Sequence, residues 1–223
     1  MVNEIIFFAH IICSIGLTLA ALYLGKEALI AAIAAQAIFA NLFVFKQTVL
    51  FGLQVTCGDV YIVSGVLGLN LLQEYFGKEV TQKAIFIGIF LSLWYLLMSF
   101  FQLIYIPSNV DTTQVHFRAL LGHAPRVIIA SHIVSFTVQH IDCFLYGKLK
   151  SFFADSYMAL RNIISISITQ SLDTVLFSFL GLYGLVESLW DIMIMSFAVK
   201  MMVIVLAAPA AALTKKYMKQ QIP

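Results

Sequence analysis

The sequence has little charge. Only 11% of its 223 residues are charged, whereas roughly a quarter are charged in an average soluble domain, and 61% are hydrophobic. A soluble globule of this length cannot bury so much apolar surface, so lipid must cover the excess. The chain is therefore predicted to be a polytopic membrane protein.

Motifs for nucleic-acid binding, metal binding and catalysis are absent from the sequence. No basic tract is interleaved with aromatic residues, and Cys13, Cys57 and Cys143 stand alone in apolar stretches without CxxC spacing. There is also no HExxH, no GxSxG, no Walker loop and no Gly-x-Gly-Asp of an intramembrane aspartyl protease. We expect no enzyme activity, no nucleic-acid partner, no metal and no cofactor.

Apolar runs divide the chain into seven blocks. Each is near or above the ~20 residues that a helix needs to cross a bilayer. The blocks are 5–24, 28–45, 48–74, 84–106, 126–147, 156–183 and 188–213. We therefore expect an all-α polytopic membrane protein with about seven transmembrane helices, forming a single transporter domain over 1–223.

Six helices are the fallback, because the second block is short and glycines interrupt the third. One of these two blocks is a candidate for a broken or re-entrant segment. The first block has no basic residue before it, so Ile5 to Leu24 is expected to be a retained helix and not a signal peptide.

Basic residues predict the orientation of the chain in the membrane. With the C-terminus inside, three basic residues lie in outer segments, Lys46, Arg118 and Arg126, and eight lie in cytoplasmic segments, Lys26, Lys78, Lys83, Lys148, Lys150, Lys215, Lys216 and Lys219. This bias follows the positive-inside rule and predicts an N-out, C-in topology. The link from Pro107 to Pro125 would then be external. We expect a plain surface loop there, with a short lid helix as the alternative.

Ionisable residues inside apolar blocks are the strongest functional signal. Such residues are costly in lipid and often mark a substrate or ion path. They are Asp59, Glu74, Asp142, Arg161, Asp173, Asp191 and Lys200. Asp142 and Asp173 are expected to be functional, because packing rarely requires a carboxylate. Arg161 and Lys200 either neutralise these acids or contact the ligand, and Asp59 and Asp191 are left open between function and packing.

Helical spacing places polar residues along one face of two consecutive helices. Residues 131, 135, 139 and 142 of the first helix are Ser, Ser, Gln and Asp, and residues 162, 165, 169 and 173 of the second are Asn, Ser, Thr and Asp, with Gln170 beside them. The serines are more typical of helix packing than of ligand binding. We expect the two polar stripes to face each other.

Several of these segments resemble a known family. They are "ANLFVFK" (40–46), "NLLQEYFGKE" (70–79), "PRVIIAS…QHID" (125–142) and "LRNIISISITQSLDTVLF" (160–177), followed by Lys200 and Pro209. Over about residues 36–215 the chain resembles the queuosine precursor transporter family. Members are bacterial inner-membrane proteins that import 7-deazaguanine precursors of a tRNA nucleoside, with a fold similar to the membrane substrate-binding components of vitamin transporters.

The resemblance implies a set of substrate-binding residues. Those on family motif positions are Glu74, Gln139, Asp142, Arg161, Asn162, Gln170, Asp173 and Lys200. Asn70 stands where the family usually has an acid, so the charge at that position differs. The resemblance also implies a nucleobase substrate such as preQ0, preQ1 or queuine. A homodimer is compatible with this resemblance. Two alternative functions also stay open: a binding subunit that needs a separate ATP-driven energising partner, and a carrier of another purine or vitamin.

The chemistry of these residues suits a planar polar base. A guanine-like edge presents a ring N–H and an exocyclic amine side by side, and one carboxylate can accept both. Asp142 and Asp173 could divide the recognition of the base and of a cationic amine. In straight helices, however, the two acids would differ in depth by ~15 Å. Either the helices are tilted or broken, or one of the two acids belongs to a gate or a proton path.

Overall fold

The computed structural model describes residues 2–152 and 158–202, and most of these residues are helical. The elements are α1 (Val2–Leu24), α2 (Lys26–Phe43), β1 (Gln47–Leu50), β2 (Leu53–Thr56), α3 (Asp59–Phe76), α4 (Lys78–Ile104), α5 (Gln114–Leu121), α6 (Ala124–Phe152), α7 (Met158–Phe177), a π-helical turn η1 (Ser178–Leu182) and a helix over 189–202. The expected helical architecture is confirmed.

Apolar surface covers the outside of the helices. Phe86 on α4, for example, is 72% exposed, and many large apolar side chains of α1 and α4 also face outward. A surface of this kind is compatible with lipid and not with water. Among the described residues, four segments are long and apolar enough to cross a membrane: Val2–Leu24, Lys26–Phe43, Lys78–Ile104 and Gln114–Val138. The expected total of seven crossings stays a prediction.

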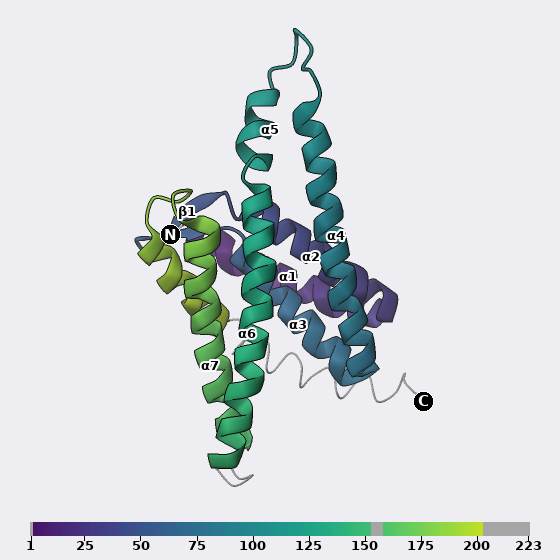
Figure 1. Ribbon diagram of the computed structural model, residues 1–223, viewed down its shortest axis with the longest axis vertical. Coiled ribbons are helices and arrows are strands. Elements are labelled where there is room, and N and C mark those ends of the chain that lie inside the picture. The colour runs from purple at the N-terminus through teal and green to yellow at the C-terminus, as the bar shows by residue number, and fades with distance from the viewer. Residues whose placement is uncertain (1, 153–157, 203–223) are drawn as a thin grey trace.

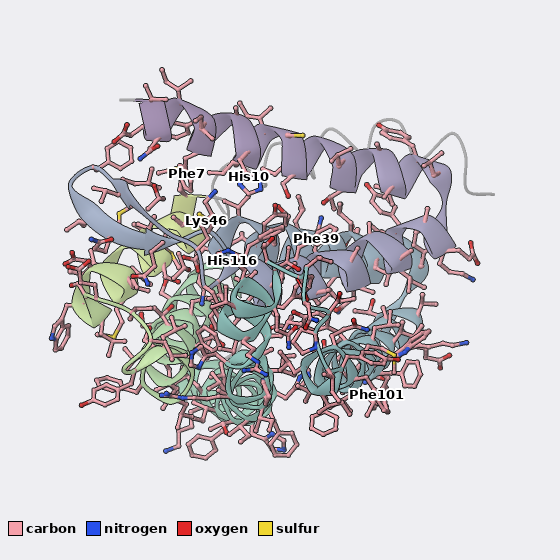
Figure 2. The ribbon with its side chains drawn as sticks, turned by 90° about the horizontal axis from the view of Figure 1, so that it is seen from above. Phe7, His10, Phe39, Lys46, Phe101 and His116 are labelled. Atoms are coloured by element: carbon pink, nitrogen blue, oxygen red, sulfur yellow. The ribbon has the colours of Figure 1, made fainter. Side chains whose placement is uncertain are left out.

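The helices form two groups that cross steeply. α4, α6 and α7 run along the longest axis of the molecule, and α1 and α2 run across them (Figure 1). Figure 2, turned by 90°, shows α1 along its length and α4 and α6 close to end-on. α3 packs against α1 and α2, and α7 packs along α6. The crossing groups contact each other where α2 packs against α4 and α6.

The third apolar block begins with a β hairpin, so the expectation of one helix over 48–74 was wrong. β1 and β2 pair antiparallel, with Gln47 opposite Thr56 and Leu50 opposite Leu53. Phe51 and Gly52 connect the strands with φ of 52° and 82°. Two positive φ angles define a tight primed turn, and Gly adopts one of them without strain. The expectation that this part of the chain could be broken is confirmed.

The hairpin links two distant helix ends. At the start of α1, Asn3 Nδ2 donates hydrogen bonds to Thr48 Oγ1 and to the Val49 carbonyl, both at 3.1 Å. On the other side, the Gln54 N–H donates to Asp191 Oδ2 at 3.3 Å, in the first turn of the helix over 189–202. The N-terminal end of α1 is therefore fixed beside the segment that follows η1.

The link from Pro107 to Pro125 also differs from the main expectation, because it contains α5 and is not a plain loop. Asp111 Oδ1 accepts hydrogen bonds from the hydroxyl and the N–H of Thr113, each at 2.7 Å, just before α5 begins. These bonds stabilise the ionised carboxylate and hold the pKa of Asp111 below its ordinary value. The short-helix alternative was correct.

Gly58 allows α3 to begin directly against the end of α2. A Cβ atom at this position would lie 3.0 Å from the Ala40 carbonyl oxygen and 3.3 Å from Val44 Cα. Both neighbours are backbone atoms, which cannot move aside as a flexible side chain would. The absent side chain therefore determines how deeply Asp59, the first residue of α3, enters the molecule.

We predict that Gly58→Ala destabilises the protein. The added methyl group overpacks a backbone contact, and such changes typically cost about 1–3 kcal/mol. The melting temperature of the purified protein in detergent should fall, as measured by loss of the monodisperse peak in size-exclusion chromatography after heating.

Gly88→Ala on α4 is the matched control. A Cβ atom at Gly88 has no neighbour within 4 Å. Alanine favours a helix over glycine by about 1 kcal/mol, so this variant should melt at the wild-type temperature or above it. Equal melting temperatures for Gly58→Ala and wild type would contradict the close packing at α3.

Candidate functional site

A buried ion pair joins α7 to the helix over 189–202. Lys200 Nζ lies 2.5 Å from Asp173 Oδ2 and donates a second hydrogen bond to Thr174 Oγ1 at 3.1 Å. The Lys200 side chain is 5% exposed, whereas that of Asp173 is 26% exposed. The lysine is therefore enclosed by protein, and part of the aspartate remains accessible.

A second acid approaches the same helix from α3. Asp59 is 7% exposed, and its Oδ1 accepts a hydrogen bond from Ser196 Oγ at 2.8 Å. Ser196 and Lys200 are four residues apart, so both lie on one face of their helix. Three elements thus bring two carboxylates and one ammonium group together, and we call Asp59, Asp173, Thr174, Ser196 and Lys200 the charge cluster.

The groups of the charge cluster act on one another electrostatically. Lys200 and Asp173 both lie close enough to Asp59 for their charges to affect its ionisation. Oδ2 of Asp59 is buried and has no hydrogen-bond donor among residues 2–152 and 158–202. An ionised oxygen in this position lacks the donors that normally compensate for lost water.

A shallow groove opens beside the charge cluster, between α7 and the following helix. Its volume is about 240 Å³, and its walls are almost wholly apolar. Its lining residues are Ser171, Thr174, Val175, Trp190, Met193, Ile194 and Phe197. Since Thr174 also binds Lys200, the groove reaches a residue of the charge cluster from the outside.

The structure brings three of the predicted site residues to this region. Asp173 and Lys200 form the ion pair, which is the neutralising role left open for Lys200. Gln170 lies one turn before Asp173 on α7, is half-buried, and accepts the Thr174 hydroxyl at its backbone carbonyl. Its side chain shares a helix face with Asp173 and Thr174.

Two predicted site residues lie at the other end of α3. Asn70 and Glu74 are exposed near its C-terminus. Glu74 follows Asp59 by 15 positions, which corresponds to a rise of ~22 Å along the helix. A single small base could not contact Glu74 and the charge cluster together in this conformation, and the binding roles of Asn70 and Glu74 stay predictions.

Four further predicted residues lie on α6 and α7, but their side chains fall outside the described part of the structure. They are Gln139, Asp142, Arg161 and Asn162. α6 and α7 do pack against each other. In the described part of α6, however, Ser135 of the polar stripe is exposed while Val134 and Val138 are buried, so the stripe does not face the core at that point.

Sequence reasoning did not assign Asp59, Thr174 and Ser196 to the site. Asp59 was recognised as an acid in an apolar block, but nothing in the sequence identified its partner, which is 137 positions away. A signal was nevertheless present. Ser196 and Lys200 form a polar face at helical spacing in the last block, as the residues of the other two stripes do.

Comparisons with known proteins match the chain to one family and to one named relative. The family described as "Putative vitamin uptake transporter" matches residues 56–214, a range that contains the whole charge cluster. A protein of Bacillus subtilis (strain 168) named "Probable queuosine precursor transporter" is 31% identical over 199 residues, which cover 86% of this chain and 85% of that protein.

No solved structure matches the chain. The expected likeness to the substrate-binding components of vitamin transporters therefore stays a prediction. The resemblance drawn from the sequence is confirmed by both matches, and a transporter family agrees with the apolar helices and the buried charges. The chain belongs to the family described as "Putative vitamin uptake transporter", which matches residues 56–214.

Proposed function

We propose that this protein imports a queuosine precursor, namely a 7-deazaguanine such as preQ0 or preQ1, or queuine, across the bacterial inner membrane. The observation that carries the proposal is the 31% identity to a relative named as such a transporter, over 86% of the chain. The imported base would serve the salvage of precursors for tRNA modification. The chain acts as a single transporter domain without catalysis of its own.

The charge cluster supports a polar base as the substrate. One oxygen of Asp173 is held by Lys200, and part of the side chain remains exposed. The free face of this carboxylate can accept the adjacent N–H donors of a guanine-like edge. Gln170, on the same face of α7, adds an amide that can bind a carbonyl or ring nitrogen of the same base.

The other predicted residues are assigned to the route that the base takes through the protein. We assign base or amide contacts to Gln139, Asp142 and Asn162 and a charge-balancing role to Arg161. Asn70 and Glu74, which lie far along α3 from Asp59, would contact the base at a different stage of its passage. An alternating-access cycle supplies such stages, because each stage exposes one end of the path.

We further propose an N-out, C-in topology. This topology places the N-terminus, the link around Lys46 and the link around Glu187 on the outer side. In the structure these three segments lie together: Asn3 binds Thr48, and Gln54 Nε2 donates to Glu187 Oε2 at 3.2 Å. These contacts support the assignment of all three segments to one side of the membrane.

We predict that expression of this protein restores precursor uptake in bacteria that lack both their own importer and precursor synthesis. Queuosine should then appear in tRNA when a 7-deazaguanine or queuine is supplied at low concentration, as measured by mass spectrometry of tRNA digests. An excess of unlabelled guanine, adenine or riboflavin should compete weakly.

Purified protein in vesicles provides the control for an energising partner. Uptake of labelled base by this protein alone would exclude a need for a separate ATP-driven module. Strong competition by another purine or a vitamin would instead identify a different substrate and contradict the proposal.

We predict that Asp173 is required for uptake beyond its role in the ion pair. Asp173→Asn leaves the Lys200 ammonium buried without its counter-ion, which typically costs about 3–5 kcal/mol, so the amount of folded protein should fall. The double variant Asp173→Asn/Lys200→Met removes both charges and should recover the folded protein. Its uptake should stay about 10- to 100-fold below wild type, because a charge-assisted hydrogen bond to the base is lost.

Glu187→Gln is the matched control, since this exposed acid binds Gln54 and lies outside the charge cluster. It should transport at the wild-type rate. Folded protein is measured by size-exclusion chromatography, and uptake by accumulation of labelled base per folded molecule. Wild-type uptake by the double variant would show that the ion pair is purely structural.

A further inference from the structure

The charges of the cluster do not cancel. It contains two carboxylates, Asp59 and Asp173, and one ammonium group, Lys200. Two of the three N–H donors of the ammonium group bind Asp173 and Thr174. Among the described residues, Asp59 forms no ion pair, so with both acids ionised the cluster carries one uncompensated negative charge.

The hydrogen bonds of Asp59 do not make up for this missing counter-ion. Oδ1 accepts a single bond from the Ser196 hydroxyl, and Oδ2 is buried with no donor in the described residues. An ionised carboxylate has room for about four hydrogen bonds, and burial with one neutral donor is costly. A proton on Oδ2 removes this cost, because only a neutral hydroxyl then remains to be satisfied.

Among the described residues, the other titratable groups near this end of α3 do not supply a positive charge to Asp59. His10 of α1 packs edge-on against Tyr61, with ring centroids 4.8 Å apart (Figure 2 labels His10). Lys46 is exposed, and its charge acts electrostatically on the thiol of the neighbouring Cys57. Asp191 is an acid and has no positive charge to offer. The first turn of α3 favours a negative charge, but this effect is small beside the cost of burying an ion.

We propose that Asp59 binds the proton that drives import, an inference that rests on the transport of a 7-deazaguanine-like base proposed above. The proton enters from the outer side, bonds to Oδ2 of Asp59, and leaves to the cytoplasm when that O–H bond breaks. No other covalent bond changes. The ligand of this site is therefore a proton, and the process is a symport of one proton with each base.

Protonation also explains why the proton and the base would bind together. A neutral Asp59 becomes a hydrogen-bond donor, whereas the ionised form only accepts. Its O–H can donate to the carbonyl oxygen of the base while Asp173 accepts the N–H groups of the same edge. Each ligand thus strengthens binding of the other, which is the coupling that a symporter needs.

The test uses the full-length protein reconstituted in vesicles, with labelled 7-deazaguanine base as the probe. Wild type should accumulate the base about tenfold when the outside is one pH unit more acidic, since that gradient corresponds to a tenfold ratio for one proton per base. Addition of base should also make the weakly buffered external solution more alkaline, as read by a pH-sensitive dye.

Asp59→Asn keeps the Ser196 bond but cannot bind a proton. Its amide N–H can donate to the base carbonyl as the O–H of the protonated acid would, so it should still exchange labelled for unlabelled base at equal pH on both sides, which shows that it is folded and binds substrate. It should lose both accumulation and the alkaline shift. Asp191→Asn, which changes an acid on the same helix as Lys200, should behave as wild type. Gradient-driven accumulation by Asp59→Asn at the wild-type level would overturn the proposal.

Two wild-type outcomes keep the proton proposal separate from the proposed function. Exchange of the base without any effect of the pH gradient, or accumulation that follows a sodium gradient, would overturn the role of Asp59 and leave the substrate assignment intact. Absence of any exchange by wild type would instead overturn the proposed function.

Discussion

One buried ammonium group, that of Lys200, joins α7 to the helix over 189–202, which also binds α3. It binds Asp173 and Thr174 on α7, and Ser196 one turn before it binds Asp59 on α3. Separating a buried lysine from its partner typically costs about 3–5 kcal/mol, so the helix over 189–202 is held firmly to α7. Ser196 holds the first turn of α3 to this helix, and Gly58 allows the close contact of that turn with the end of α2.

The β hairpin restrains the same helix from its other end. Gln54 in β2 binds Asp191 and Glu187, while Asn3 and Glu4 of α1 bind the strand and turn residues. The bonds of Asn3 and Glu4 and the bond from Gln54 to Glu187 are exposed, and the part-buried bond to Asp191 is long at 3.3 Å, so each is individually weak. The helix over 189–202 is thus fixed strongly near Lys200 and weakly near Asp191. A rocking motion of the helix would first release the end beside the hairpin, which is the end that the proposed topology places outside.

Sequence patterns predicted the helices well and the contacts between them poorly. The apolar blocks correspond to α1, α2, α4, α6 and α7, because helix length in lipid follows from bilayer thickness. The hairpin at 47–56 was missed, since a short apolar run does not distinguish a strand from a helix. Asp173 was identified because a carboxylate in an apolar block is conspicuous. Its pairing with Lys200 and the approach of Asp59 depend on tertiary contacts, which no local pattern encodes.

The two partners of the ion pair differ in exposure, and this difference determines what the pair can bind. A purely structural pair is most stable when both partners are enclosed and fully hydrogen-bonded. Here Lys200 is enclosed, while Asp173 stays partly accessible beside a groove and Asp59 has an oxygen without a donor among the described residues. The cluster is therefore stable enough to hold three elements together, yet incompletely satisfied. Groups left in that state bind a donor or a proton favourably when one arrives, because the cost of their burial has already been met by folding. This is the physical basis for a carrier that must bind its ligands on one side and release them on the other.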